Sequence, residues 1–138
     1  MGLRDDIAGA WRLLRWESHA PDGAISLPYG ERLVGLLLFT PSGFMSGQIM
    51  LPEDGALSSA AAVVAGSMRY IAYCGPFTVD EAAMTITTLV EASVSRSWVG
   101  TDQVRRVELS GDTLVLRPPP RPAGDQAVLT WRRLGSPG

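Results

Sequence analysis

The sequence has few of the residues from which metal, disulfide and redox sites are built. Among its 138 residues there is one cysteine, Cys74, and one histidine, His19. A single cysteine excludes an internal disulfide, and a single histidine excludes a zinc or iron site with several histidine ligands. The sequence also contains no Cys-x-x-Cys pair, phosphate-binding glycine loop or dinucleotide fingerprint. We therefore expect neither a metal nor a bound cofactor.

Long apolar runs and an excess of positive charge are missing too. The longest apolar stretches, around residues 33–39 and 60–65, are too short to span a bilayer. A formal net charge of -2 provides no basic field to attract nucleic acid or an anionic membrane. Residues 1–10 carry charged side chains before any apolar run, unlike a secretory signal peptide. Together with the lone cysteine, these features predict a cytoplasmic protein without nucleic-acid or membrane partners.

What the sequence does contain is a series of short strand-like segments. Its composition is typical of a single ordered domain, expected over residues 1–138 with a frayed tail at 135–138. Strands are expected at residues 11–18, 33–40, 44–50, 77–80, 83–95, 101–109, 113–117 and 127–134. About eight strands joined by turns favour a mostly β fold, an up-and-down antiparallel β-barrel. Closure of such a barrel removes exposed edges and leaves room for one ligand.

One segment has a different character from the strands. Residues 57–73 are rich in alanine, and Ser58 or Ser59 can cap a helix start. The apolar residues of this segment do not alternate with the period of two that a half-buried strand requires. We expect one helix at about 57–73, covering a barrel end or lying on the outer wall, and ended by Gly75-Pro76.

Several segments, taken in order along the chain, carry a family resemblance. They are Gly9-Ala-Trp11, Tyr29-Gly30, Phe39-Thr-Pro-Ser-Gly-Phe-Met-Ser46, Ala72-Tyr73-Cys-Gly75, Val90-Glu91, Trp98-Val-Gly-Thr-Asp-Gln-Val-Arg-Arg106, Leu109-Ser-Gly-Asp-Thr-Leu114 and Thr130-Trp-Arg-Arg-Leu134. With them the chain resembles the bacterial and fungal lipocalin-like domain family, calycin-type β-barrels, almost from end to end. Many members lie among natural-product biosynthesis genes, and related barrels include cofactor-free cyclases of polyenes or polyketides. The resemblance implies a barrel with a ligand cavity.

The chain departs from the family at two places. Thr88-Leu89 stands just before Val90-Glu91, where the family often has histidine, and Arg96-Ser97 stands before Trp98, where it often has Pro-Asn. If the family's histidines transfer protons, this chain lacks that step or performs it differently.

Polar residues in phase with an apolar strand face are the candidates for chemistry. Along the expected strand at 101–109, Val107 and Leu109 share a face with Gln103 and Arg105, because side chains alternate along a strand. If the apolar pair lines the barrel, Gln103 and Arg105 line it as well. An inward arginine requires an acceptor, since an unpaired buried charge is costly.

The expected acceptor for Arg105 is Glu91 on the preceding strand, with Glu17 as an alternative. One hypothesis is a salt bridge that only stabilises the barrel. The other is a catalytic site, in which Arg105, Gln103 and Gln48 bind a carbonyl or enolate oxygen of the ligand and Glu91 acts as the base. The residues alone leave both open.

The walls of the expected cavity come from aromatic, polar and flexible apolar side chains. Tyrosine hydroxyls can donate at the barrel mouth, tryptophans form broad walls, and methionine adapts to irregular apolar shapes. The candidate ligand-binding residues are Trp16, Glu17, Tyr29, Phe39, Met45, Gln48, Tyr73, Thr88 and Trp98. Ordinary core packing is the alternative role for the aromatic residues and methionines of this set.

Three functions are compatible with these patterns. The first is a cofactor-independent cyclase or isomerase acting on a polyketide-like intermediate, which the family resemblance favours. The second is a non-catalytic carrier or binding protein for a small hydrophobic metabolite. The third is a structural barrel with a filled interior, which the inward Gln103 and Arg105 disfavour. A homodimer through an outer sheet face or the helix is compatible with all three.

Overall fold

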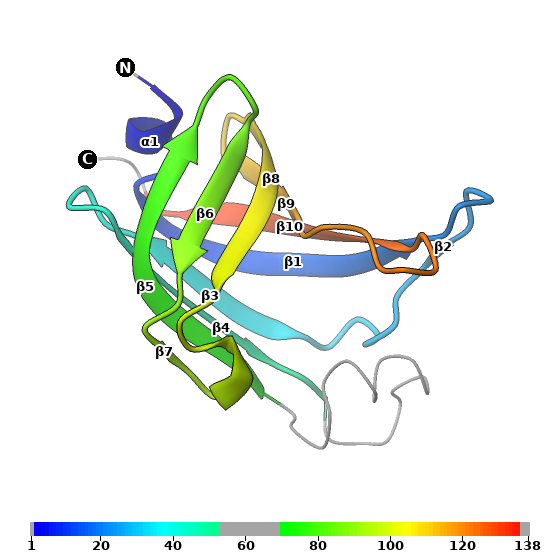
Figure 1. Cartoon of the computed structure of the whole chain (residues 1–138). Coiled ribbons are helices and arrows are strands. Elements are labelled where there is room, and N and C mark those ends of the chain that lie inside the picture. Colours follow the sequence, from blue (N-terminus) through cyan, green and yellow to red (C-terminus); the bar gives the residue numbers. More distant parts are fainter. Residues whose placement is uncertain (1, 53–69, 136–138) are drawn as a thin grey trace.

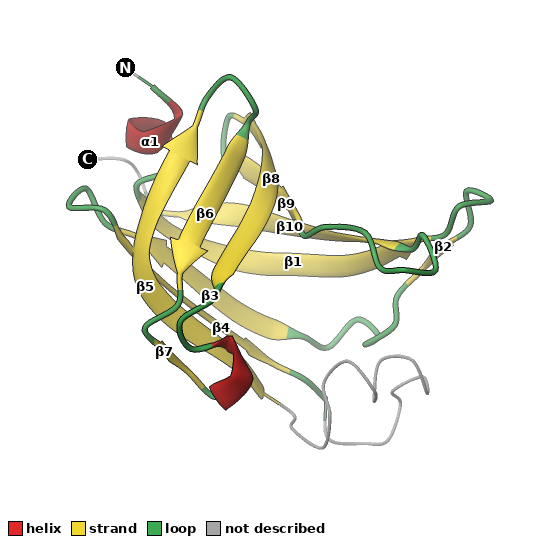
Figure 2. Cartoon of the chain, in the orientation of Figure 1, coloured by secondary structure: helices red, strands yellow, loops and turns green. Residues whose placement is uncertain are grey.

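The computed structural model describes residues 2–52 and 70–135 of the chain. The described part is mostly β, with one short α-helix and one 3-10 turn (Figure 2). In chain order the elements are α1 (Leu3–Asp6), β1 (Gly9–His19), β2 (Ile25–Ser26), β3 (Val34–Phe39), β4 (Phe44–Met50), β5 (Tyr70–Asp80), β6 (Thr85–Leu89), β7 (Ala92–Ser93), η1 (Arg96–Trp98), β8 (Asp102–Ser110), β9 (Thr113–Arg117) and β10 (Gln126–Leu134).

Eight of the described strands form a closed antiparallel barrel. Neighbours follow the order β10-β9-β8-β6-β5-β4-β3-β1, and β1 pairs back with β10 from Ala10↔Leu134 to His19↔Gln126. The two-residue strands β2 and β7 add to the edges of β1 and β5. Since each long strand pairs with the next one along the chain, the predicted up-and-down barrel is confirmed.

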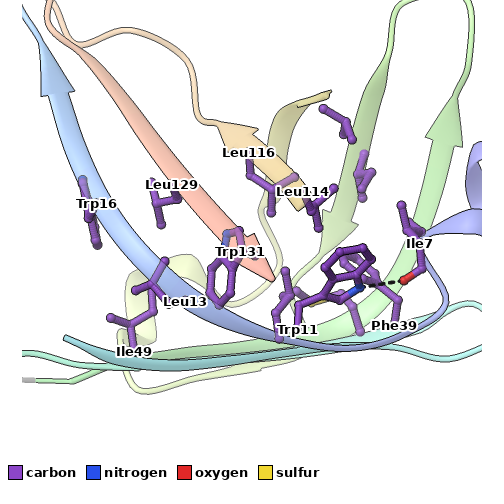
Figure 3. Close-up of a cluster of buried hydrophobic side chains, with 14 of the residues drawn as sticks. Ile7, Trp11, Leu13, Trp16, Phe39, Ile49, Leu114, Leu116, Leu129 and Trp131 are labelled. Atoms are coloured by element: carbon purple, nitrogen blue, oxygen red, sulfur yellow. Dashed lines mark hydrogen bonds between the residues drawn. The ribbon is translucent and has the colours of Figure 1, made fainter. Parts of the chain in front are cut away.

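A packed core closes one end of the barrel. The helix α1 lies at this end (Figure 1). Trp11 and Ile7 are fully buried there, and the indole Nε1 of Trp11 donates a hydrogen bond to the Ile7 carbonyl at 2.9 Å (Figure 3). Phe39 and Phe77 meet edge to face beside them, with ring centroids 5.1 Å apart. β2 and the connection between β9 and β10 lie at the opposite end (Figure 1). Any ligand space must therefore lie toward β2 and away from α1.

A β-bulge in β1 changes which residues face inward. The register with β10 shifts between Leu13 and Arg15, so that Leu14 and Arg15 are both exposed and Trp16 is buried. A bulge inserts one extra residue and reverses the alternation beyond it. Glu17, the alternative acceptor for Arg105, was expected to share the inward face of Trp11 and Leu13. It is half-buried instead, and its Oε2 lies 3.6 Å from the Nε of Arg15.

The expected helix at 57–73 is wrong at its C-terminal end. Residues 70–73 begin β5 and pair with β4, from Met50↔Tyr70 to Gly47↔Tyr73. Pairing with a neighbouring strand outweighs the local helical pattern, and aromatic and β-branched residues suit a pleated strand. Residues 57–69 of the expected helix, and 136–138 of the expected frayed tail, lie outside the described residues.

The expected strand at 83–95 is interrupted where the chain crosses β5. After β6 ends at Leu89, the backbone passes Gly75, and the Glu91 amide donates to the Cys74 carbonyl at 2.9 Å. A Cβ on Gly75 would lie only 2.0 Å from the Leu89 carbonyl oxygen, so only glycine allows this crossing. Beyond it, β7 and η1 lie along the rim of the barrel (Figure 1).

Candidate functional site

The barrel encloses a cavity of about 610 Å³, a size that suits a small organic molecule. Inward residues of β10 line it in succession from Ala127 through Leu129 to Trp131, so it extends along this strand toward the closed end. Figure 3 shows Trp131 between Trp16 on the cavity side and Trp11 in the closed end. The described lining residues are Trp16, Leu37, Gly47, Gln48, Ile49, Tyr70, Ile71, Ala72, Tyr73, Ser93, Ser95, Trp98, Gln103, Arg105, Leu116, Pro118, Pro119, Arg121, Ala127, Leu129 and Trp131.

Arg105 lines the cavity from β8, as its strand phase predicted. Its Nη1 donates to the Val104 carbonyl at 2.9 Å and its Nη2 to Gln103 Oε1 at 3.2 Å. The guanidinium carbon lies 6.0 Å from the centroid of the Tyr73 ring, within cation–π range. A guanidinium has five N–H donors, and described residues use two of those of Arg105. The others have no partner among the described residues and can donate to a ligand.

Gln103 and Gln48 also line the cavity, but their amides are engaged with neighbouring side chains. Gln103 accepts from Arg105 through Oε1 and donates through Nε2 to Thr101 Oγ1 at 3.2 Å. Gln48 Nε2 donates to Ser46 Oγ at 2.8 Å. Gln103 therefore orients Arg105, and the guanidinium is the main donor of this wall.

The expected pair of Arg105 and Glu91 is not formed. Glu91 is exposed, while its neighbour Val90 is buried, because the chain turns at the crossing over Gly75. Glu17, the alternative acceptor, contacts Arg15 and His19 and does not line the cavity. Among the described residues that line the cavity there is no carboxylate.

Of the aromatic candidates, Trp16, Tyr73 and Trp98 line the cavity. The rings of Tyr73 and Trp98 meet edge to face with centroids 5.5 Å apart, and this pair forms a wall beside Arg105. The Trp16 ring packs on Tyr29, with centroids 4.5 Å apart. Tyr29 is fully buried behind Trp16 and is not itself a lining residue.

The other three candidates lie in the core instead of the cavity. Phe39, Met45 and Thr88 are all buried, and none of them lines the cavity. Phe39 packs on Phe77, and Met45 pairs across the sheet with both Phe39 and Gly75. Phe39 and Met45 belong to the packed core, and Thr88 lies between Phe77 of β5 and Gln103 of β8 in the sheet.

Trp131 and Arg121 are among the lining residues that the sequence did not single out as ligand contacts. Trp131 is 3% exposed, and its Nε1 has no hydrogen-bond partner among the described residues. A tryptophan in the last strand, where the barrel closes, is expected to have a structural role, so the sequence did not mark it as a ligand contact. Arg121 lies in the proline-rich connection between β9 and β10, where no strand periodicity indicates which way a side chain points.

The Tyr29 hydroxyl lies beside Arg121. The guanidinium of Arg121 approaches this hydroxyl but does not reach the geometry of a direct hydrogen bond. Burial raises the pKa of Tyr29 above its ordinary value, and the nearby charge of Arg121 only partly offsets this effect. Tyr29 therefore remains a neutral phenol at physiological pH and does not neutralise Arg121.

Residues 2–52 and 70–135 contain no group of three or more histidine, cysteine, aspartate or glutamate residues placed to hold a metal ion. No helix in this part of the chain has the length and hydrophobicity needed to cross a membrane.

Comparison with known proteins agrees with this architecture. The model of the lipocalin-like domain family matches residues 8–134. The chain is similar to the 4'-hydroxy-3'-methoxypropiophenone carrier protein ppsC of Aspergillus oryzae (strain ATCC 42149 / RIB 40), with 37% identity over 107 residues. The aligned region covers 65% of this chain and 96% of that protein.

A solved structure shares the fold. A lipocalin-like protein from Bacteroides uniformis ATCC 8492 aligns with 94% of this chain and 99% of its own, with a TM-score of 0.50 and 18% identity. The matched family model and the closed barrel confirm the resemblance inferred from the sequence motifs. The chain belongs to the lipocalin-like domain family.

Proposed function

We propose that this protein binds a small, largely apolar carbonyl compound inside the barrel and carries it without chemical change. The observation that carries the proposal is the cavity itself, in which aromatic and aliphatic walls surround the Arg105 N–H donors that no described residue uses. Ligand sites of this kind bury an apolar body and orient it with a few polar groups. An aryl ketone, with a flat ring and one carbonyl oxygen, has the matching chemistry.

The similarity to the carrier protein ppsC supports carriage. That protein is a carrier of 4'-hydroxy-3'-methoxypropiophenone, an aryl ketone, and the chain matches nearly its whole length. Carriage requires only a complementary cavity.

A cofactor-independent cyclase or isomerase acting on a polyketide-like intermediate is the second candidate. The observation that favours it is Arg105, because a guanidinium in an apolar cavity can polarise a carbonyl and so activate an unsaturated substrate. The aromatic walls could hold a flexible chain near its reactive shape.

The proposed binding is tested by calorimetric titration with propiophenone, a plain aryl ketone. Ala72→Phe fills part of the cavity from β5 and should weaken binding at least about tenfold, or about 1.4 kcal/mol. The matched control is Val104→Phe, which places the same ring on the exposed face of β8 and should bind as wild type does. Equal binding by both variants, or none by wild type, would contradict the proposal.

Carriage and turnover are separated by following the ligand. Native mass spectrometry would first identify the molecule that co-purifies with the protein from its producing strain. The linear precursor of that molecule would then be added in excess over the protein. Recovery of unchanged precursor supports a carrier. Multiple turnovers that are lost in Arg105→Gln, while the precursor still binds, would instead support the cyclase.

A further inference from the structure

We propose that the cavity binds its ligand as an oxyanion, the ionised form of an acidic group on a planar unsaturated molecule, through Arg105 and Arg121. This inference rests on the proposed binding function and adds the charge state that the site selects. Both arginines line the cavity, and neither forms an ion pair with any described carboxylate.

The described partners of Arg105 are all neutral groups. Its described partners are the Val104 carbonyl, the Gln103 amide and the face of Tyr73. These contacts orient the guanidinium, but they leave its positive charge uncompensated and several of its N–H donors free. Partial burial makes that charge costly until an acceptor, best a charged one, completes its hydrogen bonds.

Arg121 is positioned by a turn that packs on the neighbouring loop. Its amide donates to the Asp125 carbonyl at 2.9 Å, and the Gly124 amide donates to its carbonyl at 2.8 Å. Gly124 lies against Pro21, where a Cβ would approach the proline ring to 2.9 Å. The connection therefore holds Arg121 at the cavity, beside Tyr29, which is a neutral phenol.

The balance of charge in the cavity is opposite to that of the whole chain. The protein carries a net charge of -2, yet the described cavity lining includes two arginines and no carboxylate. An opposite charge within a few ångströms lowers the pKa of a bound acid by about 1 to 3. A phenol, enol or carboxylic acid whose ring lies between Trp16 and the Tyr73–Trp98 pair would therefore bind preferentially in its ionised form.

The test compares an ionisable ligand with its neutral twin. The probes are 4'-hydroxypropiophenone and 4'-methoxypropiophenone, in which a methyl group replaces the acidic proton. The ultraviolet absorbance of the bound phenol reports its ionisation directly as pH is varied. We expect the pKa of the bound phenol to fall by at least about 1, so that the anion binds at least about tenfold more tightly than the neutral phenol. Affinity for the ether should be independent of pH over the same range.

Three charge-matched variants assign the effect to residues. Arg105→Gln and Arg121→Gln should each weaken binding of the phenolate by a larger factor than binding of the ether, so that much of the preference for the anion is lost. Arg12→Gln removes the same charge from the exposed outer face of β1 and should behave as wild type does. Retained binding of the ether by the first two variants shows that the barrel and its cavity are intact.

A second pair of probes, 4-propionylbenzoate and its methyl ester, distinguishes a carboxylate site from a phenolate site. Tighter binding of either anion than of its neutral partner, dependent on both arginines, supports the proposal. Equal binding within both pairs overturns the oxyanion inference but leaves the binding function standing. If none of the four probes binds, both proposals fail. An effect of Arg12→Gln as large as that of the cavity variants would overturn the assignment to Arg105 and Arg121.

Discussion

At the scale of single residues, the site combines groups that hydrogen-bond to neighbouring side chains with groups that have no partner among the described residues. Gln103 and Gln48 use their amides on neighbouring side chains, whereas Trp131 Nε1 and the Tyr29 hydroxyl have no partner among the described residues. An unpaired buried polar group costs about 1–3 kcal/mol. Of these two groups only Trp131 lines the cavity, so its indole N–H is the one that a ligand can reach.

Tyr29 makes stability sensitive to alkaline pH. Its folded-state pKa is raised by burial, so its contribution to stability is fully present below the ordinary tyrosine pKa of about 10. As pH rises from there toward the raised folded-state pKa, the unfolded chain loses the proton first and the free energy of unfolding falls. Tyr29→Phe should remove this component of the loss, as measured by urea unfolding at pH 8 and at pH values above 10.

At pH 8, Tyr29→Phe should leave the free energy of unfolding unchanged or raise it slightly, because it removes from a buried site a hydroxyl that has no partner among the described residues. Tyr70→Phe, which removes a hydroxyl from an exposed residue, is the matched control and should keep the wild-type pH dependence. The sequence contains no lysine, so no lysine titration obscures the measurement. An unchanged alkaline slope in Tyr29→Phe would contradict the prediction.

At the scale of elements, the cavity rim depends on how β6 leaves the sheet. The crossing over Gly75 directs the chain into β7 and η1, which bring Ser93, Ser95 and Trp98 to the cavity. One glycine therefore connects the register of β5 with the shape of the ligand site.

Gly75→Ala should destabilise the protein and weaken ligand binding together. The new Cβ would meet the Leu89 carbonyl oxygen at 2.0 Å and the Glu91 amide nitrogen at 3.1 Å, and backbone atoms cannot move away as a flexible side chain can. Overpacking of this kind costs about 1–3 kcal/mol. Urea unfolding and propiophenone titration measure the two effects. Thr78→Ala, at an exposed position of the same strand, should change stability by no more than about 0.5 kcal/mol.

At the scale of the whole molecule, the two ends of the described chain are joined at the closed end of the barrel. Arg133 of β10 donates to the Ala8 carbonyl at 3.1 Å and to the Asp6 carbonyl at 2.6 Å. Its guanidinium carbon lies 4.3 Å from the centroid of the Trp11 ring. This arginine links the last strand to the segment that precedes β1, and so supports closure of the sheet.

Arg133→Met should lower the free energy of unfolding by about 2–4 kcal/mol, since it removes two charge-assisted hydrogen bonds and a cation–π contact. Ligand affinity of the folded variant should be unchanged, because Arg133 does not line the cavity. Arg132→Met, at the exposed neighbouring position, serves as the control and should cost no more than about 0.5 kcal/mol. Equal losses in the two variants would show that Arg133 has no special role in closure.

The sequence by itself determined the strands and much of their orientation. Alternation along β8, where Arg105 lines the cavity and Val107 is buried, is a local property of that strand. For that reason the barrel and the wall formed by Gln103 and Arg105 could be predicted without a structure.

Only the tertiary structure decided the rest of the site. The bulge before Trp16 turned Glu17 out of phase, and the crossing at Gly75 left Glu91 exposed. Packing of the proline-rich connection on the β1–β2 turn brought Arg121 to the cavity. Each of these outcomes depends on contacts between segments distant in sequence, and a pattern that repeats every two residues along one strand carries no information about them.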